Sequence, residues 1–151
     1  MHKIIFICHG NICRSPMAEF VMKDIVNKQQ QSANYEIASC ATSREEIGNP
    51  VYPPVKKLLA QKGISCEGKS ARQFSKEDYD HYDMLIVMDE YNKANLKRMC
   101  NNDPQKKISM LLDHAKRLGE SVSDPWYTRD FNKCYDDILA GCLGLFAALN
   151  Q

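Results

Sequence analysis

The alternation of apolar and polar positions divides the chain into short strands and longer helices. Residues 3–7 form an unbroken run rich in β-branched side chains, and residues 83–89 form a second run; both runs predict buried strands. Residues 35–40 alternate as a short strand does, and residues 107–111 are expected to form a fourth strand. Apolar residues at helical spacing predict a long closing helix over 131–149.

The segments between these strands carry helical patterns and turn signals. A helix is expected to open at Ser15 and fade into the polar turn 29–32, and further helices are expected over 55–62, 74–82 and 90–100. Gly63 is placed to end the helix 55–62, and the glycine and prolines of 42–54 predict a loop. Helices that alternate with buried strands predict one α/β domain over 1–151, with four parallel strands and helices on both faces.

The stretch 6–16, Phe-Ile-Cys-His-Gly-Asn-Ile-Cys-Arg-Ser-Pro, joins the first strand to the first helix. Ser15 suits an N-cap and Pro16 the first helical position. Gly10 and Asn11 tolerate the left-handed backbone angles that a tight loop needs. Because loop amides before a helix N-terminus converge on one point, this stretch predicts a phosphate-binding loop.

Two side chains in this loop carry the predicted chemistry. A helix N-terminus and a nearby guanidinium favour the thiolate form of a cysteine, so Cys8 is expected to be a nucleophile. Arg14 offers a planar fork that matches two phosphoryl oxygens. A lone cysteine at the end of a strand is more often a small buried hydrophobe, but strand, loop and arginine together favour phosphoryl transfer at Cys8.

Composition limits the partners and the compartment. The 20 basic and 19 acidic residues give a net charge of +1, which provides no field for nucleic acid or a membrane surface. The sequence shows no signal peptide and no spacing of metal ligands among its seven cysteines. We therefore expect a cytoplasmic protein without a metal or cofactor.

Residues 8–19, Cys-His-Gly-Asn-Ile-Cys-Arg-Ser-Pro-Met-Ala-Glu, resemble the signature of the low-molecular-weight protein tyrosine phosphatases. The resemblance implies a flavodoxin-like domain and a cysteine-dependent phosphatase, either a monomer or a weak dimer. Its substrates would be phosphotyrosine-containing proteins or small aryl phosphates. The phosphate-binding residues would be His9, Gly10, Asn11, Ile12, Cys13, Arg14 and Ser15.

The segment 123–127, Ser-Asp-Pro-Trp-Tyr, adds a carboxylic acid downstream. Asp before Pro is ordinary turn chemistry, but in the resembled family an Asp-Pro followed by two aromatics lies over the pocket. The resemblance implies that Asp124 is the general acid and that Trp126 and Tyr127 form a wall for the substrate ring. Without that role, the two aromatics would cap the core beneath the loop.

Several positions supplement or depart from the family pattern. Cys13 could trap oxidised Cys8 as a reversible disulfide, or could simply be a packed core residue. Asp89 and Arg72 match polar supports of the loop, for which structural ion pairs are expected. His9 stands where the family usually has an apolar residue. Near Glu45 the family commonly has a tryptophan, which this chain lacks, so the loop 42–54 is expected to present a more acidic face through Glu45 and Glu46.

Three other functions remain open. Protein arginine phosphatases look similar throughout but tend to carry threonine where this chain has Ile12. Thioredoxin-coupled arsenate reductases share the Cys8 loop but use a further cysteine pair, whereas here Cys100 stands alone in that region. A phosphate-binding module without turnover would need neither Cys8 nor Asp124, and both are present.

Overall fold

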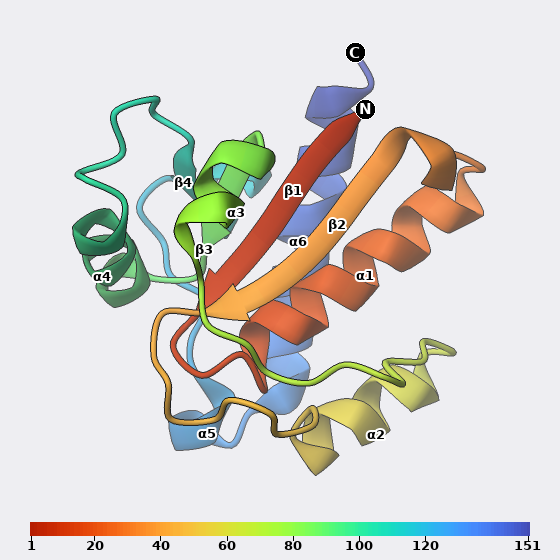
Figure 1. The fold of residues 1–151 in the computed structure, drawn as a ribbon. Helices are drawn as coiled ribbons and strands as arrows, with labels where there is room; N and C mark the ends of the chain where they lie inside the picture. The colour runs from red at the N-terminus through yellow and green to blue at the C-terminus, as the bar shows by residue number, and fades with distance from the viewer.

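A four-stranded parallel sheet forms the centre of the computed structural model, which describes residues 1–151 (Figure 1). The strands are β1 (His2–Cys8), β2 (Tyr35–Ala41), β3 (Met84–Val87) and β4 (Ile108–Met110), in the order β2-β1-β3-β4. β1 pairs with β2 along its whole length and with β3 on its other edge. The predicted α/β class with four parallel strands is confirmed.

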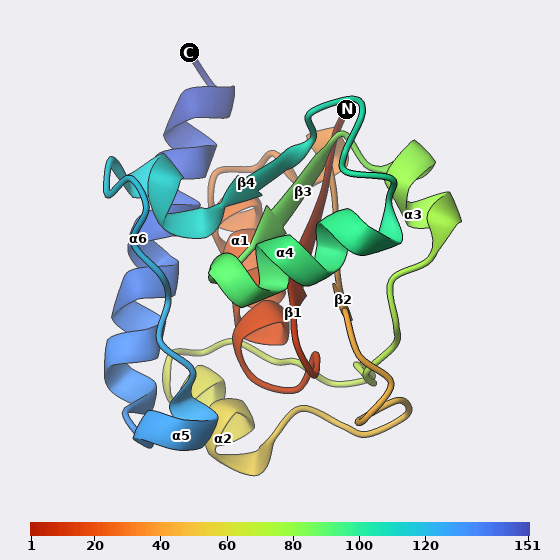
Figure 2. The same cartoon turned by 90° about the vertical axis from the view of Figure 1, so that its left-hand side faces the viewer.

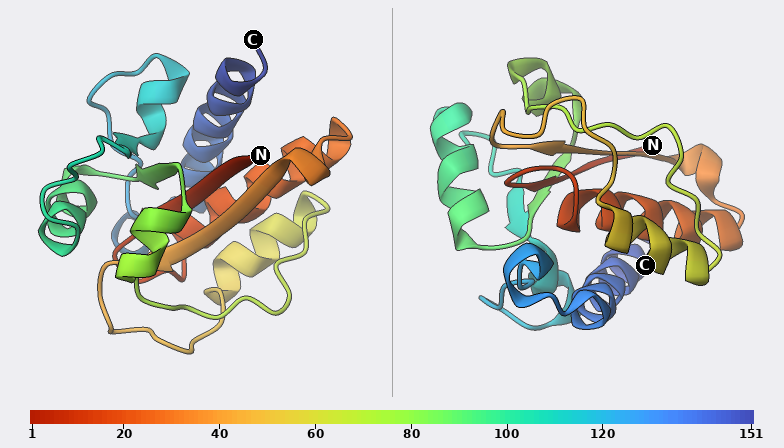
Figure 3. Two further views of the ribbon diagram at one scale, coloured as in Figure 1. Left: turned by 45° about the horizontal axis from the view of Figure 1, so that its top comes forward. Right: turned by 90° about the horizontal axis from the view of Figure 1, so that it is seen from below.

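Helices cover both faces of the sheet, as Figures 2 and 3 show. One face carries α1 (Arg14–Lys28), α2 (Pro53–Gln61) and α6 (Phe131–Leu149), and the other carries α3 (Lys76–His81) and α4 (Glu90–Met99). Three short elements complete the chain: η1 (Ser32–Asn34), η2 (Leu111–Ala115) and α5 (Pro125–Thr128).

The side chains of β1 are divided between two apolar clusters. Ile4 and Phe6 pack into the larger cluster with α1, α2 and α6, while Ile5 and Ile7 pack into the smaller one with α3 and α4. All four are fully buried, and burial of each such side chain contributes about 1.5–3 kcal/mol. The central strand is therefore held rigidly from both sides, and with it Cys8 at its end.

Two helices begin earlier than the sequence pattern predicts. α1 begins at Arg14 with Cys13 as its N-cap, so the prediction of Ser15 as the cap is wrong. The Ser15 hydroxyl lies instead against Cys8, inside the first helical turn. α2 begins at Pro53, two residues earlier than expected, because a proline lacks the N–H that the first turn leaves unpaired.

The closing helix lies close against η2 because two of its residues are glycines. A Cβ atom on Gly144 would lie 1.9 Å from the carbonyl oxygen of His114, and one on Gly141 would lie 2.5 Å from Leu111 Cγ. This close approach fixes the start of the segment 116–124, which leads to α5. In Figure 1 the loops after β1 and β2 and helix α5 lie in the lower half of the view, away from the two termini.

Candidate active site

The loop between β1 and α1 closes around the sulfur of Cys8. The backbone N–H groups of Asn11 and Ser15 each lie 3.4 Å from Cys8 Sγ, and the Ser15 hydroxyl oxygen lies 3.0 Å from it. Asn11 adopts a left-handed conformation with φ of +60°, which asparagine tolerates better than most residues. Two backbone donors and one hydroxyl therefore surround the sulfur of Cys8, a residue that is only 3% exposed.

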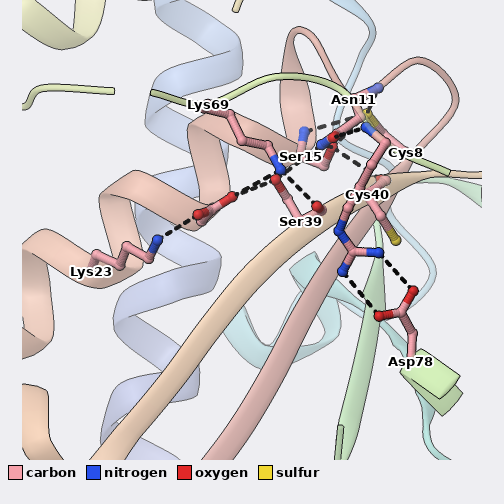
Figure 4. Close-up of polar contacts among 10 residues, drawn as sticks. Cys8, Asn11, Ser15, Lys23, Ser39, Cys40, Lys69 and Asp78 are labelled. Atoms are coloured by element: carbon pink, nitrogen blue, oxygen red, sulfur yellow. Dashed lines mark hydrogen bonds and ion pairs between the residues drawn. The ribbon is translucent and has the colours of Figure 1, made fainter. Parts of the chain in front are cut away.

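The Asn11 side chain connects this cradle to β2 (Figure 4). Its amide nitrogen donates to Ser15 Oγ at 2.8 Å and to Ser39 Oγ at 2.9 Å, and its carbonyl oxygen accepts the Arg72 backbone N–H. Because Ser15 Oγ accepts a hydrogen from Asn11, its own hydroxyl hydrogen is available to point at Cys8 Sγ. The Cys40 carbonyl oxygen, 3.4 Å from Ser15 Oγ, is a second and longer acceptor for that hydrogen.

A buried carboxylate ends this chain of hydrogen bonds. Ser39 Oγ donates to Glu19 Oε1 at 2.5 Å, because a carboxylate can only accept, and this leaves Ser39 free to accept from Asn11. Lys23 Nζ lies 2.5 Å from Glu19 Oε2, and Lys69 Nζ lies 3.5 Å from Oε1. Burial lowers the pKa of Lys69, and Glu19 partly opposes that shift.

The sequence pattern did not predict that Glu19, Ser39, Lys23 and Lys69 belong to the site. The available signal was a polar stripe at i, i+4 spacing on α1, formed by Ser15, Glu19 and Lys23. Glu19 is only 5% exposed on a helix whose neighbouring side chains are apolar. A charge on a core-facing stripe indicates a buried partner, but the sequence does not identify Ser39 as that partner.

Arg14 is buried at the other side of the loop and is held by acceptors from two segments. Its Nη1 lies 2.7 Å from Asp89 Oδ2 and donates to the Val122 carbonyl at 2.8 Å, while Nη2 lies 3.5 Å from Asp124 Oδ2. Burial alone would lower the pKa of Arg14, but the negative charges of Cys8 and Asp89 outweigh it and raise the pKa. The guanidinium therefore stays charged beside the cradle.

The two predicted polar supports serve different partners. Asp89 pairs with Arg14 and also accepts the Asn92 backbone N–H at 2.7 Å, which caps α4. Arg72 forms a two-pronged ion pair with Asp78 at 2.8 and 3.0 Å, while its backbone holds Asn11. The expectation of a structural ion pair is confirmed for both residues.

A cavity of about 210 Å³ opens above the cradle. Its lining brings together nearly all residues singled out from the sequence: Cys8, His9, Gly10, Asn11, Ile12, Cys13, Arg14, Glu45, Glu46, Asp124, Trp126 and Tyr127. Ser15 does not line this cavity, because its side chain is fully buried against the sulfur. Its backbone N–H points at Cys8 Sγ from 3.4 Å, so its predicted place among the phosphate-binding residues stays a prediction.

The rim of the cavity combines aromatic, acidic and basic side chains. Trp126 and Tyr127 are 45% and 80% exposed, and the Trp126 backbone N–H donates to Asp124 Oδ1 at 3.0 Å. On the loop 42–54, Glu45 pairs with His9 Nε2 at 2.7 Å. The expected acidic face of that loop is thus part of the cavity mouth.

All seven cysteines are free thiols in this structure. Burial, together with the charges of Cys8 and Asp124, raises the pKa of Cys13 to about 12, so this thiol is protonated at neutral pH. No group of three histidine, cysteine or carboxylate side chains is placed to hold a metal ion. No helix is both long enough and apolar enough to cross a membrane.

Comparison with known proteins places this geometry in one family. The family model described as low molecular weight phosphotyrosine protein phosphatase matches residues 3–151. The chain is 35% identical over 152 residues to the low molecular weight protein-tyrosine-phosphatase YfkJ of Bacillus subtilis, covering 100% of this chain and 97% of that protein. It is 36% identical over 143 residues to the mouse low molecular weight phosphotyrosine protein phosphatase, covering 92% and 90%.

Solved structures show the same similarity. The crystal structure of YfkJ superposes with a TM-score of 0.95 at 35% identity, covering 99% of this chain and 95% of the other. The crystal structure of a Drosophila arginine phosphatase superposes with a TM-score of 0.91 at 27% identity, covering 99% and 98%. The predicted family resemblance is confirmed on sequence and on fold.

Proposed function

This chain belongs to the low molecular weight phosphotyrosine protein phosphatase family, and we propose that it hydrolyses phosphotyrosine through a phosphocysteine formed on Cys8. The observation that carries this proposal is the surrounding of Cys8 Sγ. Two backbone N–H groups at 3.4 Å and a hydroxyl at 3.0 Å aim at a sulfur that lines a cavity also lined by Arg14 and Asp124. Donors in that arrangement stabilise a thiolate and, beside it, a bound phosphoryl group.

In the first step the Cys8 thiolate attacks phosphorus and the bond to the phenolic oxygen breaks. Charge in this loose transition state lies mostly on the three equatorial oxygens. The loop amides and the Arg14 guanidinium are positioned to hold those oxygens, and Asp89 fixes the guanidinium at 2.7 Å. Trp126 and Tyr127 flank the leaving ring at the mouth of the cavity.

Asp124 gives its proton to the departing phenolate oxygen. Its carboxyl group lines the cavity with 27% of the side chain exposed, and the Trp126 N–H orients one oxygen. Deprotonated Asp124 then takes a proton from the water that attacks phosphocysteine, releasing phosphate and the thiolate. The Ser15 hydroxyl, whose oxygen lies 3.0 Å from the sulfur, eases that departure.

The substrates we infer are phosphotyrosine-containing proteins or small aryl phosphates, with no added cofactor. Seven free thiols, one of them the nucleophile, suit a reducing compartment, and we place the reaction in the cytoplasm. Phosphoarginine is the second candidate substrate, favoured by the similarity to the Drosophila arginine phosphatase. Ile12 in the cavity wall favours the aromatic ring, because its apolar side chain offers no hydrogen bond to a guanidinium.

The test measures phosphate release from a phosphotyrosine peptide and from a phosphoarginine peptide, with a chelator present. We expect turnover of phosphotyrosine, its loss in Cys8→Ser, and no loss in Cys66→Ser, a buried cysteine outside the cavity. Asp124→Asn should lower kcat/KM about 10²-fold for phosphotyrosine. Preference for phosphoarginine would replace the substrate but keep the mechanism, and release unaffected by Cys8→Ser would overturn both.

A further inference from the structure

Tyr52 contacts both halves of the proposed active site. Its backbone N–H donates to the Ile12 carbonyl, in the loop that carries Cys8, at 2.9 Å. Its ring packs against the ring of Trp126 with centroids 4.9 Å apart and an angle of 52°. Figure 2 shows the corresponding arrangement of elements, with α5 beside the start of α2. One residue therefore connects the nucleophile loop to the segment that begins at Asp124.

Arg129 stabilises the contact between Tyr52 and Trp126. Its Nη2 donates to the Tyr52 hydroxyl at 3.1 Å, and its guanidinium lies over the rings of Tyr52 and Phe131, at 5.5 and 5.2 Å from their centroids. A second nitrogen of Arg129 donates to the Trp126 carbonyl at 3.5 Å. Arg129 adopts a left-handed conformation, with φ of +59°, which ends α5 and turns the chain toward α6.

Asp124 has few other anchors. Its Oδ2 is 3.5 Å from Arg14 Nη2, which is a long contact, and its Oδ1 and backbone carbonyl accept only from α5 itself. The segment before it is tied down at Val122, whose backbone N–H donates to Met88. The position of Asp124 thus depends on where α5 lies, and α5 contacts the rest of the site through Trp126 and Tyr52.

We propose that Tyr52, held by Arg129, is a positioning residue that keeps Asp124 within proton-transfer distance of the leaving oxygen bound over Cys8. This inference rests on the proposed function, since it concerns the general acid of that reaction. General acid catalysis tolerates little displacement, because the donor must stay within hydrogen-bond reach of its target. A displaced Asp124 would affect leaving groups that need a proton and spare those that do not.

The leaving-group dependence of kcat/KM separates this role from a merely structural one. kcat/KM reports the steps up to phosphocysteine formation, so it includes protonation of the leaving group. We expect Tyr52→Leu to lower kcat/KM about ten-fold or more for phenyl phosphate and less than about two-fold for p-nitrophenyl phosphate, whose leaving group departs readily unprotonated. Tyr52→Phe keeps the ring on Trp126 and should restore most of the loss.

Two controls make the test decisive. Tyr35→Leu removes an aromatic ring that packs on Phe146, remote from the cavity, and should leave kcat/KM unchanged for both substrates. In an Asp124→Asn background, Tyr52→Leu should add little further loss with phenyl phosphate, because the two changes remove the same step. An equal loss on both substrates, or a full additional loss in that background, would overturn the positioning role.

The design also separates failure of the inference from failure of the proposed function. If Asp124→Asn lowers kcat/KM equally for phenyl phosphate and p-nitrophenyl phosphate, the general acid is another group and the proposed function is wrong at that point. If Asp124→Asn lowers kcat/KM more for phenyl phosphate and Tyr52→Leu does not, only the role of Tyr52 fails. Should Tyr52→Leu not fold, Arg129→Met loosens the same contact from an exposed position, and we expect the same selectivity in smaller measure.

Discussion

Asp89 Oδ2 lies 2.7 Å from Arg14 Nη1, which is the shortest contact that the buried guanidinium makes. Only 4% of the Arg14 side chain is exposed, so its charge depends on this partner for compensation. We expect Asp89→Asn to lower the free energy of unfolding by about 1–3 kcal/mol and kcat/KM about ten-fold.

Inorganic phosphate distinguishes this electrostatic role of Asp89 from simple packing. A bound anion compensates Arg14 in place of Asp89, so saturating phosphate should raise the Tm of Asp89→Asn more than that of the wild type. Thermal unfolding with and without phosphate measures the difference. Equal shifts in the two proteins would contradict the assignment, and Glu90→Gln, at the neighbouring exposed position, is the matched control.

The hydrogen bonds from Glu19 through Ser39 and Asn11 to Ser15 predict that a change at Ser39 reaches the sulfur. Ser39→Ala leaves Asn11 with one acceptor fewer and Glu19 with one donor fewer. We expect kcat to fall about five- to ten-fold with KM nearly unchanged, because the Ser15 donation to the leaving thiolate weakens. A damaged phosphate-binding loop would instead raise KM, so the unchanged KM distinguishes the two explanations. Ser32→Ala, at a remote exposed turn, should behave as wild type.

The local part of the site could be predicted from sequence, whereas the contacts between distant segments could not. Residues 6–16 form one strand–loop–helix unit, so the spacing of Cys8 and Arg14 already fixes their relation. Ser39 meets Glu19 only because the β1–β2 register sets Phe6 opposite Ser39. A single sequence carries no signal for that register.

The same limit applies to the second half of the site. Asp124 was found through the Asp-Pro-aromatic pattern, which is local, but the contact between Tyr52 and Arg129 beside α5 joins residues that are 77 positions apart. The pattern assigned Tyr52 to a loop, since it predicted a helix starting at residue 55. The helix starts at Pro53 instead, which makes Tyr52 its N-cap and fixes the direction of the chain there.

Cys13 should react far more slowly than Cys8 with alkylating reagents. Its pKa of about 12 means that the protonated form predominates at every pH below that value, and the thiolate is the reactive form. We expect iodoacetamide at pH 7 to label Cys8 first, with labelling slowed by inorganic phosphate. Peptide mass spectrometry over time reports the two rates. The expectation would be contradicted if Cys13 were labelled as fast as Cys8 in the wild type. It would also be contradicted if Cys13 in Cys8→Ser were labelled as fast as Cys8 is in the wild type.

Gly144 should be intolerant of alanine although it lies inside a helix. In an open helix interior, glycine to alanine is favourable by about 1 kcal/mol. Here the new Cβ would lie 1.9 Å from the His114 carbonyl oxygen, so α6 and η2 must separate. We expect Gly144→Ala to lower the free energy of unfolding by about 1–3 kcal/mol, measured by denaturant titration. Ala148→Gly, the reverse change in the same helix at an exposed position, should cost about 1 kcal/mol, and a stabilised Gly144→Ala would refute the packing argument.

The acidic rim should favour phosphotyrosine peptides with a lysine or arginine beside the phosphotyrosine. Glu45 and Glu46 line the cavity mouth, so residues flanking a bound phosphotyrosine pass close to their carboxylates. His9 Nε2 lies 2.7 Å from Glu45 Oε2, whereas the carboxylate of Glu46 contacts only the neutral amide of Asn49. We expect kcat/KM to be about three- to ten-fold higher for lysine-flanked than for glutamate-flanked peptides, and the ratio to shrink as salt is raised.

Charge-neutral variants test whether the rim causes that preference. Glu45→Gln combined with Glu46→Gln should bring the two peptides within about two-fold of each other, mainly through KM, and leave p-nitrophenyl phosphate unchanged because it has no flanking residues. Glu67→Gln makes the same kind of charge change at an exposed position outside the cavity, so it should keep the preference. A preference that survives in the double variant, or one that salt does not alter, would mean that contacts other than these two carboxylates select the peptide.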